Sequence, residues 1–133
     1  MFNQILQYLI VLGVFLLLDS LWIGVIAKKF YAKKLGYLMA EKPKLIAALA
    51  FYLLYIFGLM VFIINPALAQ NSGQFALLYG GLLGMIAYAT YDLTNLATVK
   101  QWPMSITIID IIWGSVMTAM TCFISFNIIS AIW

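Results

Sequence analysis

Residues Leu45–Ile64 read LIAALAFYLLYIFGLMVFII, an apolar stretch without a single charged side chain. In a helix that rises about 1.5 Å per residue, this stretch spans roughly 30 Å, which is the thickness of the hydrocarbon core of a bilayer. Backbone N–H and C=O groups in lipid must be hydrogen-bonded within the segment, so such a stretch forms a helix. The sequence therefore predicts that these residues cross a membrane.

Three further stretches are expected to cross in the same way, at about residues 5–27, 75–98 and 105–133. They are too long and too continuously apolar to be barrel strands, in which lipid-facing and lumen-facing residues alternate. Asn65-Pro66 is expected to end the second span at residue 64, and Trp102-Pro103 is expected to separate the third span from the fourth. The prediction is an all-α fold, a four-helix transmembrane bundle that forms one domain over residues 1–133.

The composition excludes most soluble classes of protein. Of the 133 residues, 66% are hydrophobic and 8% are charged, against about 45–50% and about 25% in soluble globular proteins. An ordinary soluble enzyme, a nucleic-acid-binding protein and a disordered tail are therefore excluded. The basic residues are all Lys and there is no His, so the chain has no imidazole base and no His-ligated zinc site. The single cysteine, Cys122, excludes an intrachain disulfide and a thiolate metal cluster.

The lysines predict the orientation of the chain. Six of the seven Lys fall within the segment 28–44, and the seventh, Lys100, lies between the third and fourth spans. The loop 65–74 and both termini carry no charged side chain. By the positive-inside rule, the basic loop 28–44 and the Lys100 loop are cytoplasmic, and the N- and C-termini lie on the non-cytoplasmic side.

Three of the four acidic residues, Asp19, Asp92 and Asp110, lie inside the predicted spans. Each costs about 2.5–3.5 kcal/mol at the centre of a membrane helix, so these side chains are expected to face the bundle interior or a wet cavity. Each also lies roughly 10–13 Å from the predicted cytoplasmic end of its helix. The three carboxyls are therefore expected to meet in the cytoplasmic half of the membrane and to form the catalytic centre.

Polar and aromatic residues accompany these carboxyls at helical spacing. Tyr91 and Asn95 share a face of the third span with Asp92. The pattern Asp-x-x-Trp occurs twice, which places Trp22 and Trp113 one turn after an aspartate. An indole N–H is a donor only and suits a carboxylate or a ligand headgroup. Tyr91, Asn95, Trp22 and Trp113 are therefore the expected substrate-binding residues.

Several kinds of chemistry fit a cluster of this composition. Three carboxylates without a buried cation cannot all stay ionised in a low dielectric, so one is expected to hold a proton and to form an acid/base pair with another. The same oxygens, with the Asn95 carbonyl, are ligands suited to a divalent cation. No cofactor is evident, and no metal site is assigned. The cluster could also relay protons, bind a cationic headgroup, or act only as interhelical glue through hydrogen bonds.

Three function classes follow from these alternatives. The first is a membrane-embedded site, and possible enzyme, that binds or modifies a lipid-like substrate at the cytoplasmic leaflet. The second is a proton- or cation-coupled small carrier, for which a homodimer would widen the narrow pathway that four helices offer. The third is a structural or assembly subunit. Polar groups through the full depth of the bundle would favour the carrier, and a cavity open on one side would favour lipid binding.

Ala76, Gly80 and Gly84 are spaced by four residues along the third span. Such a small-xxx-small pattern lets two helix backbones approach closely. Close packing within the bundle is the favoured interpretation, and the seam of a homodimer is the alternative.

Two motifs resemble those of a family of small bacterial predicted membrane proteins, domain of unknown function 2177. The first is Asp19-Ser20-Leu21-Trp22-Ile23-Gly24, followed by Phe30-Tyr31. The second runs from Tyr88 through Asp92 and Asn95 to Thr98 and continues through Trp102-Pro103 to Asp110-Ile111-Ile112-Trp113-Gly114. The resemblance covers essentially the whole chain. It implies a multi-pass protein of the bacterial cytoplasmic (inner) membrane, and it implies no established activity or substrate.

Overall fold

The fold is helical throughout the described part of the chain. The computed structural model describes residues 2–37 and 44–133, and no strand occurs within these ranges. The described helices, of which η1 and η2 are π-helical, are α1 (Phe2–Leu21), η1 (Trp22–Ala27), α2 (Lys28–Leu35), α3 (Leu45–Leu59), η2 (Met60–Ile64), α4 (Asn65–Gln70), α5 (Gly73–Thr98) and α6 (Met104–Ile132). The expected all-α class is confirmed.

Three of the described helices are long and apolar enough to cross a membrane. They cover Phe2–Gly24, Leu45–Gln70 and Met104–Ile132. Helix α5, at 26 residues, matches them in length, but its glycines, tyrosines and polar residues make it less apolar. The predicted third span is thus present as a helix, although composition alone does not mark it as membrane-spanning.

The first helix is longer than the predicted span. Helix α1, η1 and α2 follow one another without a break, so the chain stays helical to Leu35. The segment 28–35, expected to be part of the basic loop, is therefore helical. The remainder of that loop includes residues 38–43, which lie outside the described residues.

The expectation that Asn65-Pro66 ends the second helix is wrong. The N–H of Asn65 donates to the carbonyl of Met60, five residues earlier, which is the hydrogen-bond pattern of a π-helical turn. Pro66 then stands at the start of α4, where its missing N–H is tolerated. Helix formation therefore continues past the proline to Gln70.

The real end of this helix lies at the polar sequence Asn71-Ser72-Gly73. Asn71 adopts the left-handed conformation at φ 51°. The Asn71 and Ser72 N–H groups donate to the carbonyls of Leu68 and Ala67, which is a Schellman C-cap. The Ser72 hydroxyl then accepts from the Phe75 N–H at 3.0 Å and caps α5. A short turn follows α5, and Pro103 is the N-cap of α6, as predicted for Trp102-Pro103.

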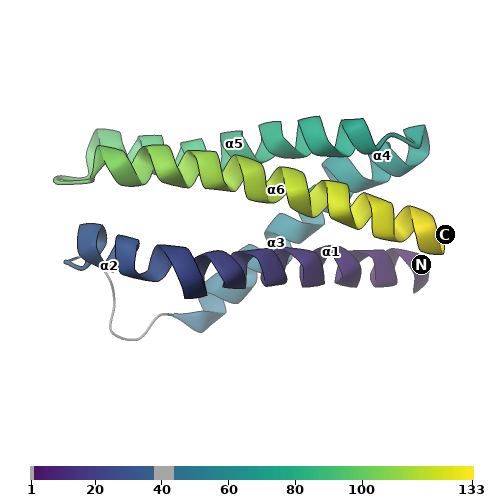
Figure 1. Cartoon of the computed structure of the whole chain (residues 1–133), viewed down its shortest axis with the longest axis horizontal. Coiled ribbons are helices and arrows are strands. Elements are labelled where there is room, and N and C mark those ends of the chain that lie inside the picture. Colours follow the sequence, from purple (N-terminus) through teal and green to yellow (C-terminus); the bar gives the residue numbers. More distant parts are fainter. Residues whose placement is uncertain (1, 38–43) are drawn as a thin grey trace.

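Helices α5 and α6 run side by side along their length (Figure 1). Their contact depends on small residues. A Cβ added at Gly84 would lie 2.4 Å from the Gly114 carbonyl oxygen, and one added at Gly80 would lie 3.0 Å from the Cys122 side chain. Ala76, Gly80 and Gly84 are all buried. The small-xxx-small pattern therefore makes close packing within the chain, which was the favoured interpretation.

The other helices complete the bundle around this pair. Helix α1 packs against α6 and α3, and α3 slants across α1 (Figure 1). The continuation of α3 into η2 and α4 packs against α5 and α6. Both termini lie at one end of the molecule, and α2 and the turn between α5 and α6 lie at the other (Figure 1). We refer to the end that holds α2 as the lysine end.

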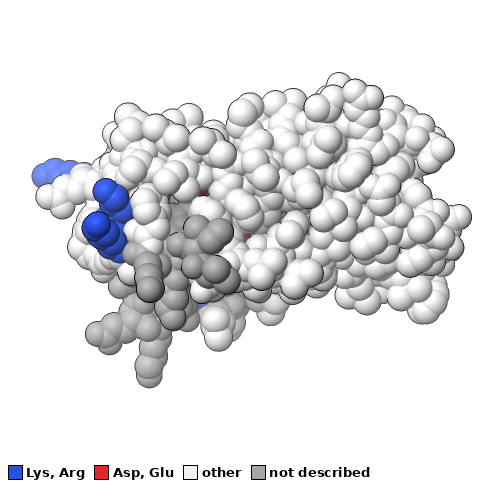
Figure 2. Space-filling model, viewed as in Figure 1, with Lys and Arg blue, Asp and Glu red and all other residues white. Residues whose placement is uncertain are grey.

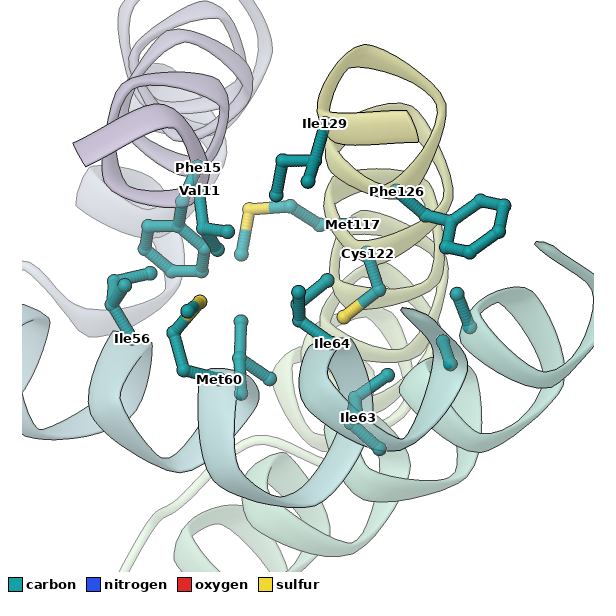
Figure 3. Close-up of a cluster of buried hydrophobic side chains, with 13 residues drawn as sticks. Val11, Phe15, Ile56, Met60, Ile63, Ile64, Met117, Cys122, Phe126 and Ile129 are labelled. Atoms are coloured by element: carbon teal, nitrogen blue, oxygen red, sulfur yellow. The ribbon is translucent and has the colours of Figure 1, made fainter. Parts of the chain in front are cut away.

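The apolar core occupies the half of the bundle nearer the termini. It brings together Val11 and Phe15 of α1, the buried side chains of η2, and α6 residues from Met117 to Ile129 (Figure 3). Figure 3 shows these side chains pointing toward one another between the helices. The buried apolar side chains of this core therefore lie away from the lysine end.

Candidate functional site

Two of the three predicted site carboxyls face each other across the α5–α6 interface. Asp92 of α5 is completely buried, at 0% exposure, and interacts directly with the half-buried Asp110 of α6. Neither Asp92 oxygen completes a hydrogen bond of regular geometry within the described residues. A single proton between the two carboxyls would turn this contact from repulsive to attractive, and the pair would then carry one negative charge.

The third predicted carboxyl has a partner of its own. The Tyr52 hydroxyl on α3 donates to Oδ2 of Asp19 on α1 at 2.6 Å. Charge-assisted O–H···O⁻ hydrogen bonds have this length. Asp19 thus connects α1 to α3, and the predicted trio divides into an Asp92–Asp110 pair and an Asp19–Tyr52 pair.

Tyr88 lies between these two pairs. Its hydroxyl interacts electrostatically with both Asp19 and Asp110, and a Cβ added at Gly114 would lie 2.2 Å from its ring. The absence of a side chain at Gly114 therefore makes room for the Tyr88 ring. The two carboxyl pairs therefore lie near each other on either side of Tyr88, but the predicted meeting of all three carboxyls in one cluster is not found.

Tyr91 and Asn95 extend this region along α5. Their side chains are hydrogen-bonded to each other, and Tyr91 also interacts with Asp92 and Asp110. The Tyr91 ring is 58% exposed and packs edge-on against Trp102 at a centroid distance of 5.8 Å. Both residues predicted to bind substrate on this helix therefore lie beside the carboxyl pair.

The two predicted tryptophans meet each other. The indoles of Trp22 and Trp113 stack at a centroid distance of 4.4 Å with an interplanar angle of 12°. The two Asp-x-x-Trp sequences thus lie side by side on neighbouring helices. The Trp113 N–H is buried and has no hydrogen-bond partner among the described residues, so its expected contact with a carboxylate is not made.

A groove of about 450 Å³ reaches the carboxyl pair from the surface between α3 and α5. Apart from Asp110, its lining is aromatic and apolar: Phe51, Ala87, Tyr88 and Tyr91. The exposed side chains of Phe51 and Tyr91 stand at its mouth. Its volume falls within the range of about 300–1,000 Å³ that is typical of ligand pockets.

One helical turn from Phe51 toward the termini, Tyr55 connects α3 to both α5 and α6. Tyr55 of α3 and Thr118 of α6 are hydrogen-bonded through their hydroxyls at 2.8 Å. The Tyr55 ring also packs edge-on against Tyr88 at 6.5 Å. The apolar core lies on the terminal side of this contact.

The charged residues are separated along the molecule. Figure 2 shows Lys side chains at one end and acidic atoms only as small recessed areas between uncharged side chains. Within residues 2–37 and 44–133, no group of three or more His, Cys, Asp or Glu side chains is placed to hold a metal ion. The three carboxyls do not converge on a single cation position, because Asp19 is directed to Tyr52.

Sequence reasoning missed the contribution of the second span. Phe51 lines the groove, Tyr52 donates to Asp19, and Tyr55 contacts Thr118 of α6. These aromatic residues recur at three- and four-residue spacing within Leu45–Ile64 and so share one helix face. That spacing could have identified the face of the second span that meets the site. It was overlooked because every residue of the stretch is uncharged, so no single face stands out.

Comparison with known proteins identifies a family. No curated protein and no solved structure matches the chain. A family model described as "Predicted membrane protein (DUF2177)" matches residues 4–127, which is nearly the whole chain. The match confirms the resemblance carried by the two aspartate-containing motifs. The chain therefore belongs to the DUF2177 family of predicted membrane proteins.

Proposed function

We propose that the protein binds a lipid-like substrate inside the membrane, in the groove between α3 and α5, and that Asp110 contacts the polar group of this substrate. The proposal includes α5 as a fourth span and a lysine end in the cytoplasm of a bacterial cell, with both termini on the other side of the inner membrane. The observation that carries it is an aromatic groove that ends at a carboxyl pair.

The depth of the groove fits a substrate drawn from one leaflet. Phe51 and Asp110 each lie six residues from the first residue of their helices, Leu45 and Met104, which is about 9 Å along the axis. Half of the hydrocarbon core is roughly 15 Å. The groove therefore opens laterally in the leaflet on the lysine side, where acyl chains of that leaflet have access. The exposed Lys33, Lys34 and Lys100 at this end favour anionic headgroups nearby.

The carboxyl pair has the character of an acid/base pair. Asp110 lines the groove and is the group that a substrate reaches. Asp92 lies behind it and is fully buried, so a proton bound at this site would be shared by the pair. A protonated and an ionised carboxyl side by side can give and take a proton at one position. The site thus supports binding, and it also supports a proton transfer to or from a bound polar group.

A purely structural role explains Asp19 better than Asp92. Interhelical glue is stabilising because its polar groups hydrogen-bond across helices, and Asp19 does so with Tyr52. Asp92 is fully buried, yet both of its oxygens lack a regular partner within the described residues. We therefore assign Asp19 to holding α1 against α3, and Asp92 and Asp110 to the site.

The charge distribution favours a binding site over a carrier pathway. Beyond the Tyr55–Thr118 contact the described core is mainly apolar. The buried polar side chains of α6 in this half, Thr118, Thr121 and Ser125, are uncharged. Within the described residues, this half adds no charged group that a proton- or cation-coupled carrier would use, which favours the lipid-binding class.

Native mass spectrometry of the protein purified in mild detergent tests this proposal. We expect the wild-type chain to retain a lipid that Ala87→Trp, which fills the groove, loses. The matched control is Leu78→Trp, at an exposed position of α5 outside the groove, and it is expected to retain the lipid. Equal retention by both variants, or no retained lipid in the wild-type chain, would overturn the proposal.

A further inference from the structure

A second cavity, separate from the groove, lies at the end of the bundle that holds both termini. Its volume of about 330 Å³ falls within the range of about 300–1,000 Å³ that is typical of ligand pockets. We call it the terminal pocket, and its described lining consists of Gln7, Leu68, Asn71, Ile129, Ser130 and Trp133. We infer that the terminal pocket binds a neutral group with several neighbouring hydroxyls, a sugar or a glycerol, through the amide of Gln7.

The buried amide of Gln7 is the observation that points to a ligand. The Gln7 side chain lines the pocket and is only 8% exposed. Its Oε1 atom is buried and has no hydrogen-bond partner among the described residues. A buried acceptor without a donor has lost its hydration and gained nothing in return, which is unfavourable. Because Oε1 can only accept, the group that relieves this cost must bring an O–H or N–H donor.

The exposed residues of the pocket narrow the choice of ligand. Asn71, Ser130 and Trp133 are exposed and carry an amide, a hydroxyl and an indole N–H, so the pocket offers donors as well as acceptors. An ionised phosphate or carboxylate brings acceptors only and leaves Oε1 of Gln7 unsatisfied. An ammonium brings donors only and uses none of the N–H groups. A hydroxyl both donates and accepts, so a group with several hydroxyls matches both kinds of partner.

The position of the terminal pocket fits a polar headgroup better than an acyl chain. Asn71 stands at the end of α4, and Trp133 follows Ile132, the last residue of α6. Gln7 lies five residues after Phe2, the first residue of α1, which is about 7.5 Å along the axis. Figure 1 shows α4 and both termini together at this end of the molecule. In the topology proposed above, this level is a membrane surface, where tryptophan is enriched.

The experiment compares lipids that share their acyl chains and differ in the polar group. The full-length protein is purified in a detergent without a sugar headgroup and mixed with equal amounts of glucosyl-diacylglycerol, diacylglycerol and phosphatidic acid. Native mass spectrometry then measures which lipid is retained. We expect the glucosyl lipid to be retained about tenfold more than either of the other two. Equal retention of the three lipids overturns the inference.

Methyl glucoside distinguishes the two sources of such a group. If it binds in a calorimetric titration and displaces the glucosyl lipid, the hydroxyls alone are sufficient and the ligand is available as a free sugar. If only the glucosyl lipid binds, the ligand is a membrane headgroup. Binding of neither overturns the inference.

Gln7→Leu removes the amide and keeps a side chain of similar size. We expect the preference for the glucosyl lipid to disappear, whereas stability in the absence of ligand stays the same or rises, because an unpartnered buried acceptor has been removed. A loss of stability would instead show that the amide is structural and would overturn the inference. The matched control is Gln4→Leu, at an exposed position of the same helix outside the terminal pocket, which should keep the preference.

A groove variant separates this inference from the proposed function. Ala87 lines the groove beside Asp110 and does not line the terminal pocket, so Ala87→Trp should retain the glucosyl lipid as well as wild type does. If Ala87→Trp loses the glucosyl lipid and Gln7→Leu retains it, the terminal pocket is not the site, while the lipid-binding proposal for the groove stands. The series of lipids on the wild-type chain decides the inference even if a variant fails to fold.

Discussion

Replacing Gly84 by alanine is expected to weaken the α5–α6 interface, because the methyl group would meet the backbone of α6. The added Cβ would lie 2.4 Å from the backbone oxygen of Gly114 and 2.6 Å from Cβ of Thr118. A backbone oxygen cannot rotate away, so the helices must separate by about 1 Å to restore ordinary contact at 3.4 Å. A radial gap of about 0.5–1 Å forfeits a quarter to a half of the dispersion attraction of the atoms that face it.

The magnitude follows from these contacts. Overpacking of a close interface costs about 1–3 kcal/mol, and the contact with backbone places Gly84→Ala in the upper part of that range. A loss of about 2 kcal/mol shifts the folding equilibrium by about thirtyfold. The same separation would pull Asp92 away from Asp110, because these residues lie on the two helices that part. Ligand binding in the groove should therefore weaken together with stability.

The assay is reversible unfolding in mixed micelles by sodium dodecyl sulfate, followed by tryptophan fluorescence. Gly58→Ala on α3 is the matched control, since nothing lies within 4 Å of the Cβ it would add. Alanine is the better helix former by about 1 kcal/mol in water, so the control should be neutral or slightly stabilising. If the two variants unfold within about 0.5 kcal/mol of each other, a difference too small for a steric conflict, the described α5–α6 contact is wrong.

Three other predictions follow from the site and the topology. Tyr52→Phe removes the hydroxyl that binds Asp19 and should cost about 1.5–3 kcal/mol in the same unfolding assay; an unchanged midpoint would show that the contact contributes nothing. Asp92→Asn supplies an N–H donor to Asp110, so the protein should be at least as stable as wild type in the same assay; a large loss of stability would indicate that the wild-type carboxyl is structural. For the topology, Lys100→Cys should react with a membrane-impermeant maleimide only after the cells are opened, whereas Asn71→Cys should react on intact spheroplasts; the reverse pattern would invert the proposed orientation.

Parts of this architecture follow from local sequence, because their causes are local. An uncharged apolar stretch in lipid has no alternative to helix formation, which is why Leu45–Ile64 is helical as predicted. The turn at Asn71-Ser72 needs only a residue tolerant of the left-handed conformation and a hydroxyl that caps the next helix. The end of the second helix was predicted wrongly at Asn65-Pro66, because a π-helical turn absorbs the missing N–H of proline. The amino-acid composition of the segment does not reveal such a π-helical turn.

The sequence by itself determined the all-helical class of the protein and the positions of its long helices, since charge and hydropathy act on each segment separately. The tertiary structure alone decided how Asp19, Asp92 and Asp110 are paired. The tight approach of α5 to α6 at Gly84 and Gly114 brings Asp92 to Asp110, whereas the slant of α3 gives Asp19 a tyrosine and leaves a groove beside the pair. Depth along a helix is a property of one segment, but the direction in which a side chain meets a neighbour depends on how whole helices cross. The helix crossing therefore explains why the three predicted carboxyls are divided between the Asp19–Tyr52 contact and the Asp92–Asp110 site.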